Sequence, residues 1–401
     1  MKKVLIVGAG LSGCTIARLL KDTGLFDVHM IEKSGSIGGN CKDYIDQYGN
    51  IISEYGPHIF HTNDSKIINF INRFSPLYYN FNHRVKASFS YLESSASSAV
   101  ELPINLNNVK LLISIFENEK IAKDVQDFLY DYKSYSGKSK LTLKNLSELQ
   151  RKEAKILYKV LIDYIYNPYS CKQWGVNDIS KINNKILDRV PIYLDEKNSY
   201  FRDDFQVYPK IGYSNMMANM IKDIPLLLSI PFEEYLELNK LSTYDLIIYT
   251  GSIDELFKYA LGRLPYRGVY FKVSYNSESL KYPLNNSFVV NYPSPAFKYT
   301  RIANYKFLNA KINPEALHEN APIIKEYPMD ALVNNRSYPI GDGQISRGYK
   351  DYLDLAKSKY PNMMFLGRLG TYKYLDMDKA IDQAFDLFNK IMKDMNKICI
   401  K

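Results

Sequence analysis

The chain has 401 residues, of which 46% are hydrophobic and 24% are charged, a composition typical of a globular protein with two or three lobes. Its 52 basic residues exceed its 43 acidic residues by nine (52 − 43). This excess is spread along the chain, so it favours anionic ligands and argues against a nucleic-acid-binding surface.

The four cysteines lack C-x-x-C spacing, which argues against a disulfide framework and a zinc site; they are Cys14, Cys41, Cys171 and Cys399. No apolar run approaches the roughly 20 residues of a membrane-spanning helix, so we expect no membrane insertion. The start, Met1-Lys-Lys with Leu11-Ser-Gly-Cys14, also imitates a lipoprotein signal. Three glycines interrupt its apolar segment, and a cytoplasmic location is therefore our prediction.

A strand, a helix and a second strand are predicted at the N-terminus. Residues 3–7 form a short apolar run that ends at Gly8, as a buried parallel strand does. A helix over residues 12–20 and a strand over 28–31 follow. Glu32 comes directly after this strand and 19 positions after Gly13 (32 − 13), where a carboxylate can bond a ribose hydroxyl. The unit therefore predicts a dinucleotide site.

Glycines shape the turn between the first strand and its helix. Gly8 permits the tight turn, Gly10 lets backbone amides approach a pyrophosphate, and Gly13 lets the helix pack on the strand. Ser12 lies at the helix start, where amide groups favour an anion. Further on, Glu32-Lys33, four more residues and Gly38-Gly39-Asn40 resemble the FAD-binding N-terminus of amine-oxidase and glutathione-reductase type flavoproteins.

The remaining elements alternate between sheet and helix. A strand is expected over 51–55, a helix capped by Asp64 over 64–74, a strand over 84–91 and a polar turn over 94–98. The period becomes helical from 107 to 166, with a break at 137–140. Strands over 246–250, 268–275, 287–292, 300–308 and 363–367 and a helix over 378–394 complete the chain.

We therefore predict an α/β fold with three parts. A discontinuous Rossmann-like FAD-binding domain comprises residues 1–82, 208–260 and 340–401. A helical domain comprises residues 100–180. An antiparallel sheet that binds the substrate comprises residues 83–99, 181–207 and 261–339. Ligands are expected in the crevice where these parts meet.

The stretch Tyr55–Thr62 contains His58, Ile59 and His61. Two histidines at i and i+3 suggest a metal site, but no further ligands stand at a recognisable spacing, so we predict no metal. Two buried polar histidines are the alternative. Gly56 gives backbone access to a flat ring, which favours a flavin-facing loop.

Together with the N-terminal motifs, these residues make the chain resemble the bacterial UDP-galactopyranose mutases. The resemblance extends over nearly the whole chain. The motifs that carry the resemblance are Gly8–Gly13, Glu32-Lys33, Gly38–Asn40, Tyr55–Thr62, Lys172–Gly175, Arg189–Pro191, Asn198–Phe201, Tyr299–Arg301, Lys325–Pro328 and Gly367–Met377. The resemblance implies an isomerase that interconverts the pyranose and furanose forms of a nucleotide-diphosphate sugar. It also implies FAD, active when reduced, whose N5 attacks the anomeric carbon without net redox change.

The resemblance assigns roles to individual residues. It places Arg189 and Arg301 on the diphosphate, where an arginine can donate bidentate bonds and stay charged, and His58 and His61 beside the reacting groups. Residues that match substrate-binding positions are His83, Tyr169, Trp174, Tyr200, Asn291, Tyr327 and Tyr374, with Tyr169 and Trp174 against uracil. Residues that match flavin-binding positions are Arg368, Tyr374, Asp376 and Met377. Core packing or a surface ion pair is the alternative for each.

UDP-galactose is the first substrate that we predict, with UDP-N-acetylgalactosamine and dTDP-fucose as alternatives. The resemblance further implies a homodimer and a role in cell-surface polysaccharide synthesis, such as that of O-antigen. Two other classes stay open. An amine-oxidase-like flavin oxidoreductase would leave the arginine pair unexplained, and a non-catalytic nucleotide-sugar-binding protein would need no reactive flavin face.

Overall fold

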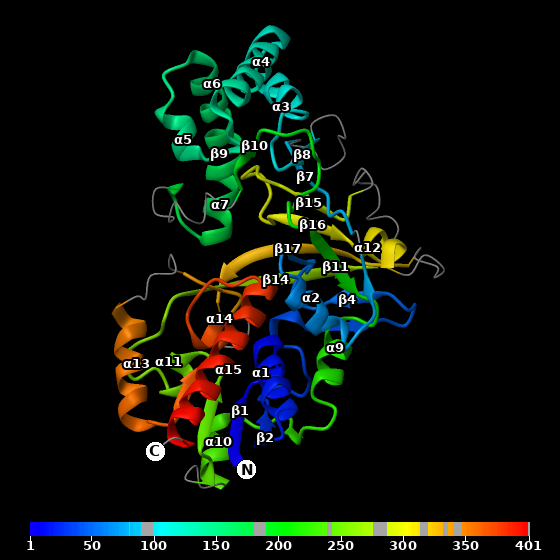
Figure 1. Cartoon of the computed structure of the whole chain (residues 1–401). Coiled ribbons are helices and arrows are strands. Elements are labelled where there is room, and N and C mark those ends of the chain that lie inside the picture. Colours follow the sequence, from blue (N-terminus) through cyan, green and yellow to red (C-terminus); the bar gives the residue numbers. More distant parts are fainter. Residues whose placement is uncertain are drawn as a thin grey trace.

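A computed structural model describes residues 1–79, 81–89, 99–179, 190–238, 243–275, 287–312, 320–331, 336–340 and 347–399. Helices from the middle of the chain form one end of the elongated molecule, a broad sheet crosses its centre, and both termini lie at the other end (Figure 1). The predicted turn at 94–98 lies outside the described residues. None of the helices in the described part is long and apolar enough to cross a lipid bilayer.

A five-stranded parallel sheet stands at the end with the termini. Its order is β12 (Leu226–Leu227), β2 (Phe26–Ile31), β1 (Lys2–Val7), β13 (Leu246–Tyr249) and β19 (Met363–Phe365). Side chains of β1 alternate between two cores: Val4 and Ile6 belong to one, and Leu5 and Val7 to the other. Both faces are therefore covered, as a parallel sheet requires.

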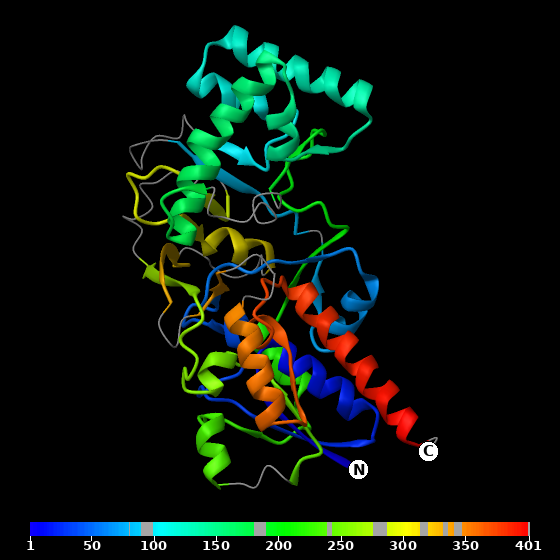
Figure 2. The same cartoon turned by 90° about the vertical axis from the view of Figure 1, so that its left-hand side faces the viewer.

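Helices supply the two covering layers. On one face α1 (Leu11–Asp22) packs against the long final helix α15 (Met377–Cys399), which Figure 2 shows descending toward the C-terminus. The other core draws on α10 (Phe232–Leu238), α11 (Ile253–Leu256) and α13 (Arg347–Lys359). Short α14 (Gly367–Gly370) follows β19 directly. This part has the predicted Rossmann-like arrangement.

A seven-stranded sheet crosses the centre. Its order is β18 (Tyr338–Pro339), β14 (Tyr266–Ser274), β17 (Ile323–Asp330), β16 (Arg301–Asn304), β15 (Val289–Asn291), β7 (Val85–Ser88) and β8 (Ala99–Leu102). All pairs are antiparallel except β15 with β7. This sheet carries residues that are up to 254 positions apart in sequence to one surface (339 − 85).

The strand predicted over 300–308 is half wrong. Strand β16 stops at Asn304, and α12 (Tyr305–Ile312) begins at the next residue. The Asn304 side-chain oxygen accepts a hydrogen bond from the Lys306 amide at 3.1 Å, as an N-cap residue does. This local side-chain bond favours a helix where the apolar pattern alone suggested a strand.

The helical part confirms the change of period near residue 107. It contains α3 (Val109–Phe116), α4 (Glu119–Ser136), α5 (Leu143–Glu148), α6 (Lys152–Leu161), the π-helix η3 (Ile162–Tyr166) and α7 (Asn167–Trp174). Helix α4 ends at Gly137, whose φ of +63° is the left-handed conformation that glycine adopts readily. A small ladder of β9 (Lys140–Leu141) and β10 (Ile192–Tyr193) joins this part to the returning chain.

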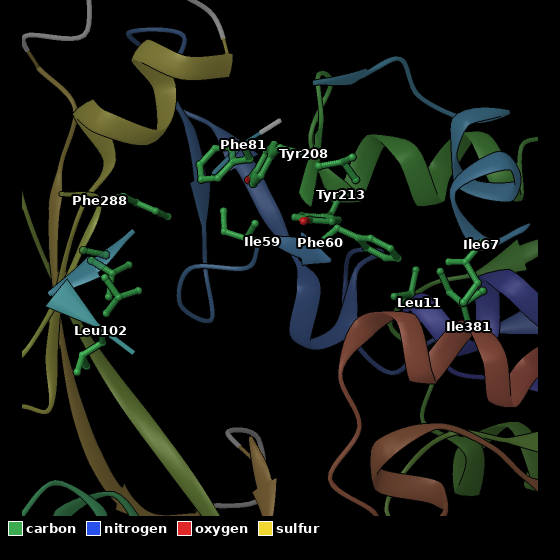
Figure 3. Packing of buried hydrophobic residues seen from close by; sticks show 14 of the residues in the cluster. Leu11, Ile59, Phe60, Ile67, Phe81, Leu102, Tyr208, Tyr213, Phe288 and Ile381 are labelled. Carbon is green, nitrogen blue, oxygen red and sulfur yellow. The ribbon is translucent and has the colours of Figure 1, made fainter. Parts of the chain in front are cut away.

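Shorter elements connect the two large sheets. They are η1 (Gly39–Cys41), β3 (Asp43–Ile45), β4 (Ile51–Ser53), β5 (Phe60–Thr62), α2 (Ser65–Asn72), β6 (Leu77–Tyr78), β11 (Phe205–Pro209) and α9 (Tyr213–Met220). Asp64 caps α2 as predicted, accepting from the Lys66 amide at 2.7 Å. Figure 3 shows one continuous core running through this region, from Leu102 past Phe81 and Tyr208 to Ile381.

The first prediction concerns the turn between β1 and α1. A Cβ atom on Gly13 would lie 2.0 Å from the Gly8 carbonyl oxygen, a backbone atom that cannot yield alone. Gly13→Ala is therefore expected to lower the free energy of unfolding by about 1–3 kcal/mol, the usual cost of overpacking. Urea unfolding measures this, with Gly35→Ala as the control because its Cβ would meet only Ser229 Oγ, at 3.5 Å. Equal losses in both variants would contradict the interpretation.

Candidate active site

A cavity of about 590 Å³ lies between the helical part and the seven-stranded sheet. Predicted site residues that line it are Ile59, His61, His83, Tyr169, Trp174, Tyr200, Asn291, Arg301, Tyr374 and Asp376. They come from β5 and the loop before it, the segments before β7 and β11, α7, β15, β16 and the segment before α15. The fold thus brings together residues that the sequence separates by more than 300 positions.

The helical wall depends on a change of helix type. Helix α6 passes into the π-helix η3, which runs directly into α7, and both Ile165 and Tyr166 of η3 line the cavity together with Tyr169 and Gln173 of α7. A π-turn inserts an extra residue and so rotates the helical residues after it. Burial raises the pKa of the Tyr169 hydroxyl, which therefore stays protonated and can donate a hydrogen bond.

Arg301, which is held in a buried ion pair, lines the wall on the side of the central sheet. Arg301 and Glu326 are direct cross-strand partners on β16 and β17, and Arg301 Nε donates to Glu326 Oε2 at 2.6 Å. Glu326 is 2% exposed, and Arg301 is 27% exposed toward the cavity. Burial raises the pKa of Glu326, and the Arg301 charge opposes that rise. Among the described residues, Nε is the one nitrogen of the Arg301 guanidinium that has a hydrogen-bond partner. The two terminal nitrogens are therefore available to an anion.

Two histidines line the cavity floor. The ring nitrogen Nδ1 of His61 lies 2.8 Å from Asp203 Oδ2, and His61 stacks on Phe201 with centroids 3.7 Å apart. The hydrogen bond from His61 lowers the pKa of Asp203. His83 is 6% exposed, and its Nδ1 has no partner among the described residues. Burial, with Lys311 and Arg301 nearby, lowers the pKa of His83 to about 3, so this imidazole is neutral.

An aromatic group closes the side toward the parallel sheet. The Tyr338 and Tyr374 rings stack with centroids 5.4 Å apart, and Trp174 lies 6.2 Å and 6.4 Å from them. The guanidinium carbon of Arg368 lies 5.1 Å from the Tyr374 ring centroid. Arg368 Nε also donates to the Leu375 carbonyl at 3.1 Å. Arg368 and Met377 do not line the cavity but adjoin its Tyr374–Asp376 border.

The loop that carries His58 rests on the buried ion pair. Gly56 has a φ of +90°, and a Cβ there would lie 3.3 Å from Glu326 Oε1. His58 Nδ1 donates to the Gly56 carbonyl at 2.7 Å. Burial and the Arg368 charge lower the pKa of His58 to about 4. Its neighbours Pro57 and Ile59 line the cavity, whereas His58 itself does not.

The predicted dinucleotide residues gather at the carboxyl edge of the parallel sheet. Gly10 and Gly38 form an isolated β-bridge, and a Cβ on Gly39 would lie 3.1 Å from the Gly10 Cα. No side chain caps the start of α1, so its amide groups can donate hydrogen bonds to an anion. Ser12 is buried there beside Gly367. These features fit a bound dinucleotide.

The other members of this set have protein partners. Glu32 Oε2 accepts from the Ala9 amide at 2.7 Å, which holds the carboxylate over the glycine turn. Lys33 Nζ pairs with Glu255 at 2.8 Å, and Asn40 Nδ2 donates to the Arg336 carbonyl at 3.3 Å. Glu32 Oε1 also accepts from the Ser34 amide at 2.8 Å and from the Ser34 hydroxyl at 2.9 Å, so these bonds fix the carboxylate at the position from which the fold pattern bonds a ribose hydroxyl.

Two of the residues predicted to bind the substrate are not placed in the cavity. Arg189 lies outside the described residues. Tyr327 points elsewhere: its ring faces Tyr299 at 5.8 Å and Tyr270 at 6.0 Å, and it does not line the cavity. Since neighbouring residues of a strand face opposite sides, the inward Glu326 requires an outward Tyr327.

Sequence reasoning did not select Tyr338, Glu326 and Asp203. The Tyr-Pro dipeptide at Tyr338 occurs six times in the chain, so it gives no local signal that distinguishes this tyrosine. Glu326 and Asp203 gain their roles from partners 25 and 142 positions away, Arg301 and His61. Within the described residues no group of three or more histidine, cysteine or acidic side chains is placed to hold a metal ion.

Comparison with known proteins assigns the chain to a family. The model of the family described as UDP-galactopyranose mutase matches residues 164–374, and that of an NAD(P)-binding Rossmann-like domain matches residues 6–74. The UDP-galactopyranose mutase of Mycoplasma genitalium is 35% identical over 396 residues, covering 94% of this chain and 92% of that protein. The chain belongs to the UDP-galactopyranose mutase family.

Other relatives of this mutase family member extend the picture. The dTDP-fucopyranose mutase of Escherichia coli is 28% identical, covering 98% of this chain and 99% of that protein. A crystal structure of reduced UDP-galactopyranose mutase has the same fold, with a TM-score of 0.64 at 15% identity, covering 98% and 94% of the two chains. The predicted fold class and the assignment as an isomerase are confirmed.

The second prediction concerns the Arg301–Glu326 pair. Glu326→Ala leaves the guanidinium without its counter-charge, and we expect the free energy of unfolding to fall by about 3 kcal/mol, the cost of breaking a buried pair. Asp354→Ala is the control because it breaks the exposed pair with Lys357, whose side chains are 59% and 75% exposed; it should cost less than about 1 kcal/mol. Urea unfolding of both variants measures the difference, and similar losses would contradict it.

The third prediction follows from the low pKa of His83, about 3 when folded. An unfolded histidine titrates near 6.5, so in the window between these values the unfolded chain binds a proton that the folded chain does not. Stability therefore falls as pH decreases, by roughly 2 kcal/mol from this group between pH 7 and pH 5. The free energy of unfolding is measured for His83→Asn and for the wild type at both pH values. It should fall less between pH 7 and pH 5 in His83→Asn than in the wild type. The control is His29→Asn, and an unchanged loss in His83→Asn would refute the assignment.

Proposed function

We propose that this family member interconverts the pyranose and furanose forms of a nucleotide-diphosphate sugar, with UDP-galactose as the first candidate. The observation that carries the proposal is one cavity lined by a cationic residue, Arg301, and by the flat rings of Tyr169 and Trp174. The arginine can bind a diphosphate through charge-assisted hydrogen bonds, and the aromatic rings can pack against a nucleotide base. The UDP-galactopyranose mutase of M. genitalium supports the choice of sugar.

The cofactor that we propose is FAD, active when reduced. Support comes from the Rossmann-like domain match, the uncapped start of α1 and the position of Glu32. Gly10 and Gly39 would leave room for the pyrophosphate, and Arg368 would lie near the flavin end. When bound and reduced, the flavin supplies a nucleophilic nitrogen for the anomeric carbon and is regenerated unchanged.

The chain's own residues would hold the departing diphosphate. Arg301 presents two terminal nitrogens while Glu326 fixes Nε, so the fork is oriented before the substrate arrives. Such charge-assisted bonds stabilise negative charge as it develops on the leaving oxygen. Arg189 is proposed as a second clamp by the family resemblance alone. Holding the diphosphate close also keeps it available for return to the sugar after the ring has changed.

Neutral groups would orient the sugar and the base. The protonated hydroxyls of Tyr169 and Tyr338, whose pKa values burial raises, can donate hydrogen bonds but carry no charge that repels a diphosphate. Neutral His83 lines the cavity without adding charge, and its buried Nδ1 has no hydrogen-bond partner among the described residues. Leu102, Pro103 and Ile165 add apolar area to the cavity lining and would limit access of water, which would hydrolyse a reactive sugar intermediate.

The identity of the sugar has a specific competitor. The full-length similarity to a dTDP-fucopyranose mutase makes dTDP-fucose a second candidate. UDP-N-acetylgalactosamine is a third. A homodimer is also proposed, for which the exposed Leu111 and Tyr135 of the helical part offer apolar area.

The fourth prediction is turnover by the reduced protein. Dithionite-reduced, FAD-loaded enzyme is offered UDP-galactopyranose, UDP-N-acetylgalactosamine and dTDP-fucopyranose, and ring isomers are separated chromatographically. One sugar should isomerise with no stoichiometric use of reductant, and the oxidised enzyme should be inactive. No isomerisation, with the flavin reoxidised by a substrate, would favour an oxidoreductase instead.

Arg301→Ala tests the clamp within the same assay. Losing charge-assisted bonds worth about 3 kcal/mol should lower kcat/KM roughly 100-fold. Arg151→Ala, which removes a 62%-exposed arginine of the helical part, is the matched control and should turn over normally. Wild-type kcat/KM in Arg301→Ala would refute the role of Arg301.

A further inference from the structure

Lys172 of α7 is surrounded by backbone carbonyl oxygens. Its Nζ lies 2.6 Å from the Tyr292 oxygen, 2.9 Å from that of Ser294, 3.1 Å from that of Phe297 and 3.0 Å from that of Tyr299. All four acceptors belong to one loop, residues 292–299, which joins β15 to β16. The Lys172 side chain of the helical part thus contacts four carbonyl groups along one loop of the central sheet.

The ammonium group is held by these oxygens and not by a carboxylate. No ion pair of Lys172 occurs among the described residues, and burial lowers its pKa to about 8, so it is charged at neutral pH. An ammonium has three hydrogens, which four carbonyl oxygens at these distances share. Without it, these carbonyls would lose the donor that satisfies them in a part-buried place.

The two segments that Lys172 joins carry opposite walls of the cavity. Helix α7 supplies Tyr169, Gln173 and Trp174, whereas the loop is flanked by Asn291 on one side and by Arg301, two residues after Tyr299, on the other. Lys172 itself does not line the cavity. The contact between Lys172 and the loop therefore affects the distance between the aromatic residues of α7 and Arg301. Lys172 itself would not touch a ligand bound between them.

A second contact holds the end of the same helix. Arg267 of β14 donates from Nε to the Gln173 carbonyl at 3.0 Å and pairs with Asp330 of β17. Gly175 caps the helix at φ +66°, and a Cβ there would lie 2.5 Å from an Arg267 nitrogen. The end of α7 is thus already attached to β14, so the specific task left to Lys172 is to bring the 292–299 loop to that helix.

We propose that Lys172 is a positioning residue that sets the spacing between the aromatic wall and Arg301, and so the fit of a nucleotide diphosphate. This inference rests on the proposed function for its ligand. A lysine that served stability alone would change the melting temperature and leave nucleotide affinity and loop protection untouched. The two roles therefore differ in what a variant with an intact fold does.

The fifth prediction compares Lys172→Met with Lys155→Met in the FAD-loaded protein. Lys155 is an exposed lysine of α6 in the same helical part and provides the matched control. Hydrogen exchange should be at least about tenfold faster in Lys172→Met over residues 292–300 and over 167–175, because both segments lose their mutual contact. Lys155→Met should exchange as the wild type does.

Nucleotide binding provides the functional readout. UDP titrated calorimetrically should bind Lys172→Met at least about tenfold more weakly, and KM for the isomerised sugar should rise while kcat changes less than about threefold. Unchanged UDP affinity together with unchanged exchange would overturn the proposal, and so would a lower melting temperature with normal affinity. If Lys172→Met does not fold, Lys172→Gln, which keeps a donor at the site, is judged by the same criteria.

The design separates this proposal from the proposed function. If the wild type binds no UDP and isomerises no sugar, the function is wrong, yet the exchange of 292–300 still reports whether Lys172 holds the loop. If the wild type binds and turns over but Lys172→Met matches it in affinity and exchange, only the positioning role is wrong.

Discussion

Close packing of backbone against backbone at the carboxyl edge of the parallel sheet is the constraint on which the rest depends. The Gly13 Cα lies against the Gly8 carbonyl, and Gly39 lies against Gly10. Side chains at these positions would separate β1, α1 and the loop after β2. Because β1 lies centrally in the sheet, its turn also sets where β13 and β19 deliver their following loops.

The central sheet contributes a charged pair, Arg301 and Glu326. Arg301 and Glu326 are neighbours across β16 and β17, so the register of those two strands decides whether the pair exists. The pair in turn lies against Gly56, which orients the loop with His58 and Ile59. Burial favours neutral histidines here, and it keeps the tyrosine hydroxyls protonated. Arg301 is thus the charged group that β16 offers to an anion in the cavity.

The helical part completes the site from a distance. The π-helix η3 and helix α7 place aromatic residues opposite Arg301, and α7 is tied to the sheet by Lys172 and Arg267. Lys172 and Arg267 both donate to backbone carbonyl groups. Such acceptors are present in the chain whatever side chains the residues carry. A cavity wall built on one end of a separate helical unit needs such contacts, since helix packing within the unit does not determine its distance from the sheet.

Local signals in the sequence determined the β1–α1–β2 unit, the Asp64 cap, the helical stretch and most strands, because glycine spacing, caps and apolar periodicity act within a few residues. The motifs also indicated ten of the 27 residues that line the cavity, through family resemblance. Only the tertiary structure placed Tyr338, and not the predicted Tyr327, at the cavity. Both tyrosines precede a proline, but which face a strand residue presents depends on its pairing with distant strands. The partners of Lys172 were decided in the same way, since backbone carbonyls leave no mark in a sequence and become ligands only when the chain is folded around them.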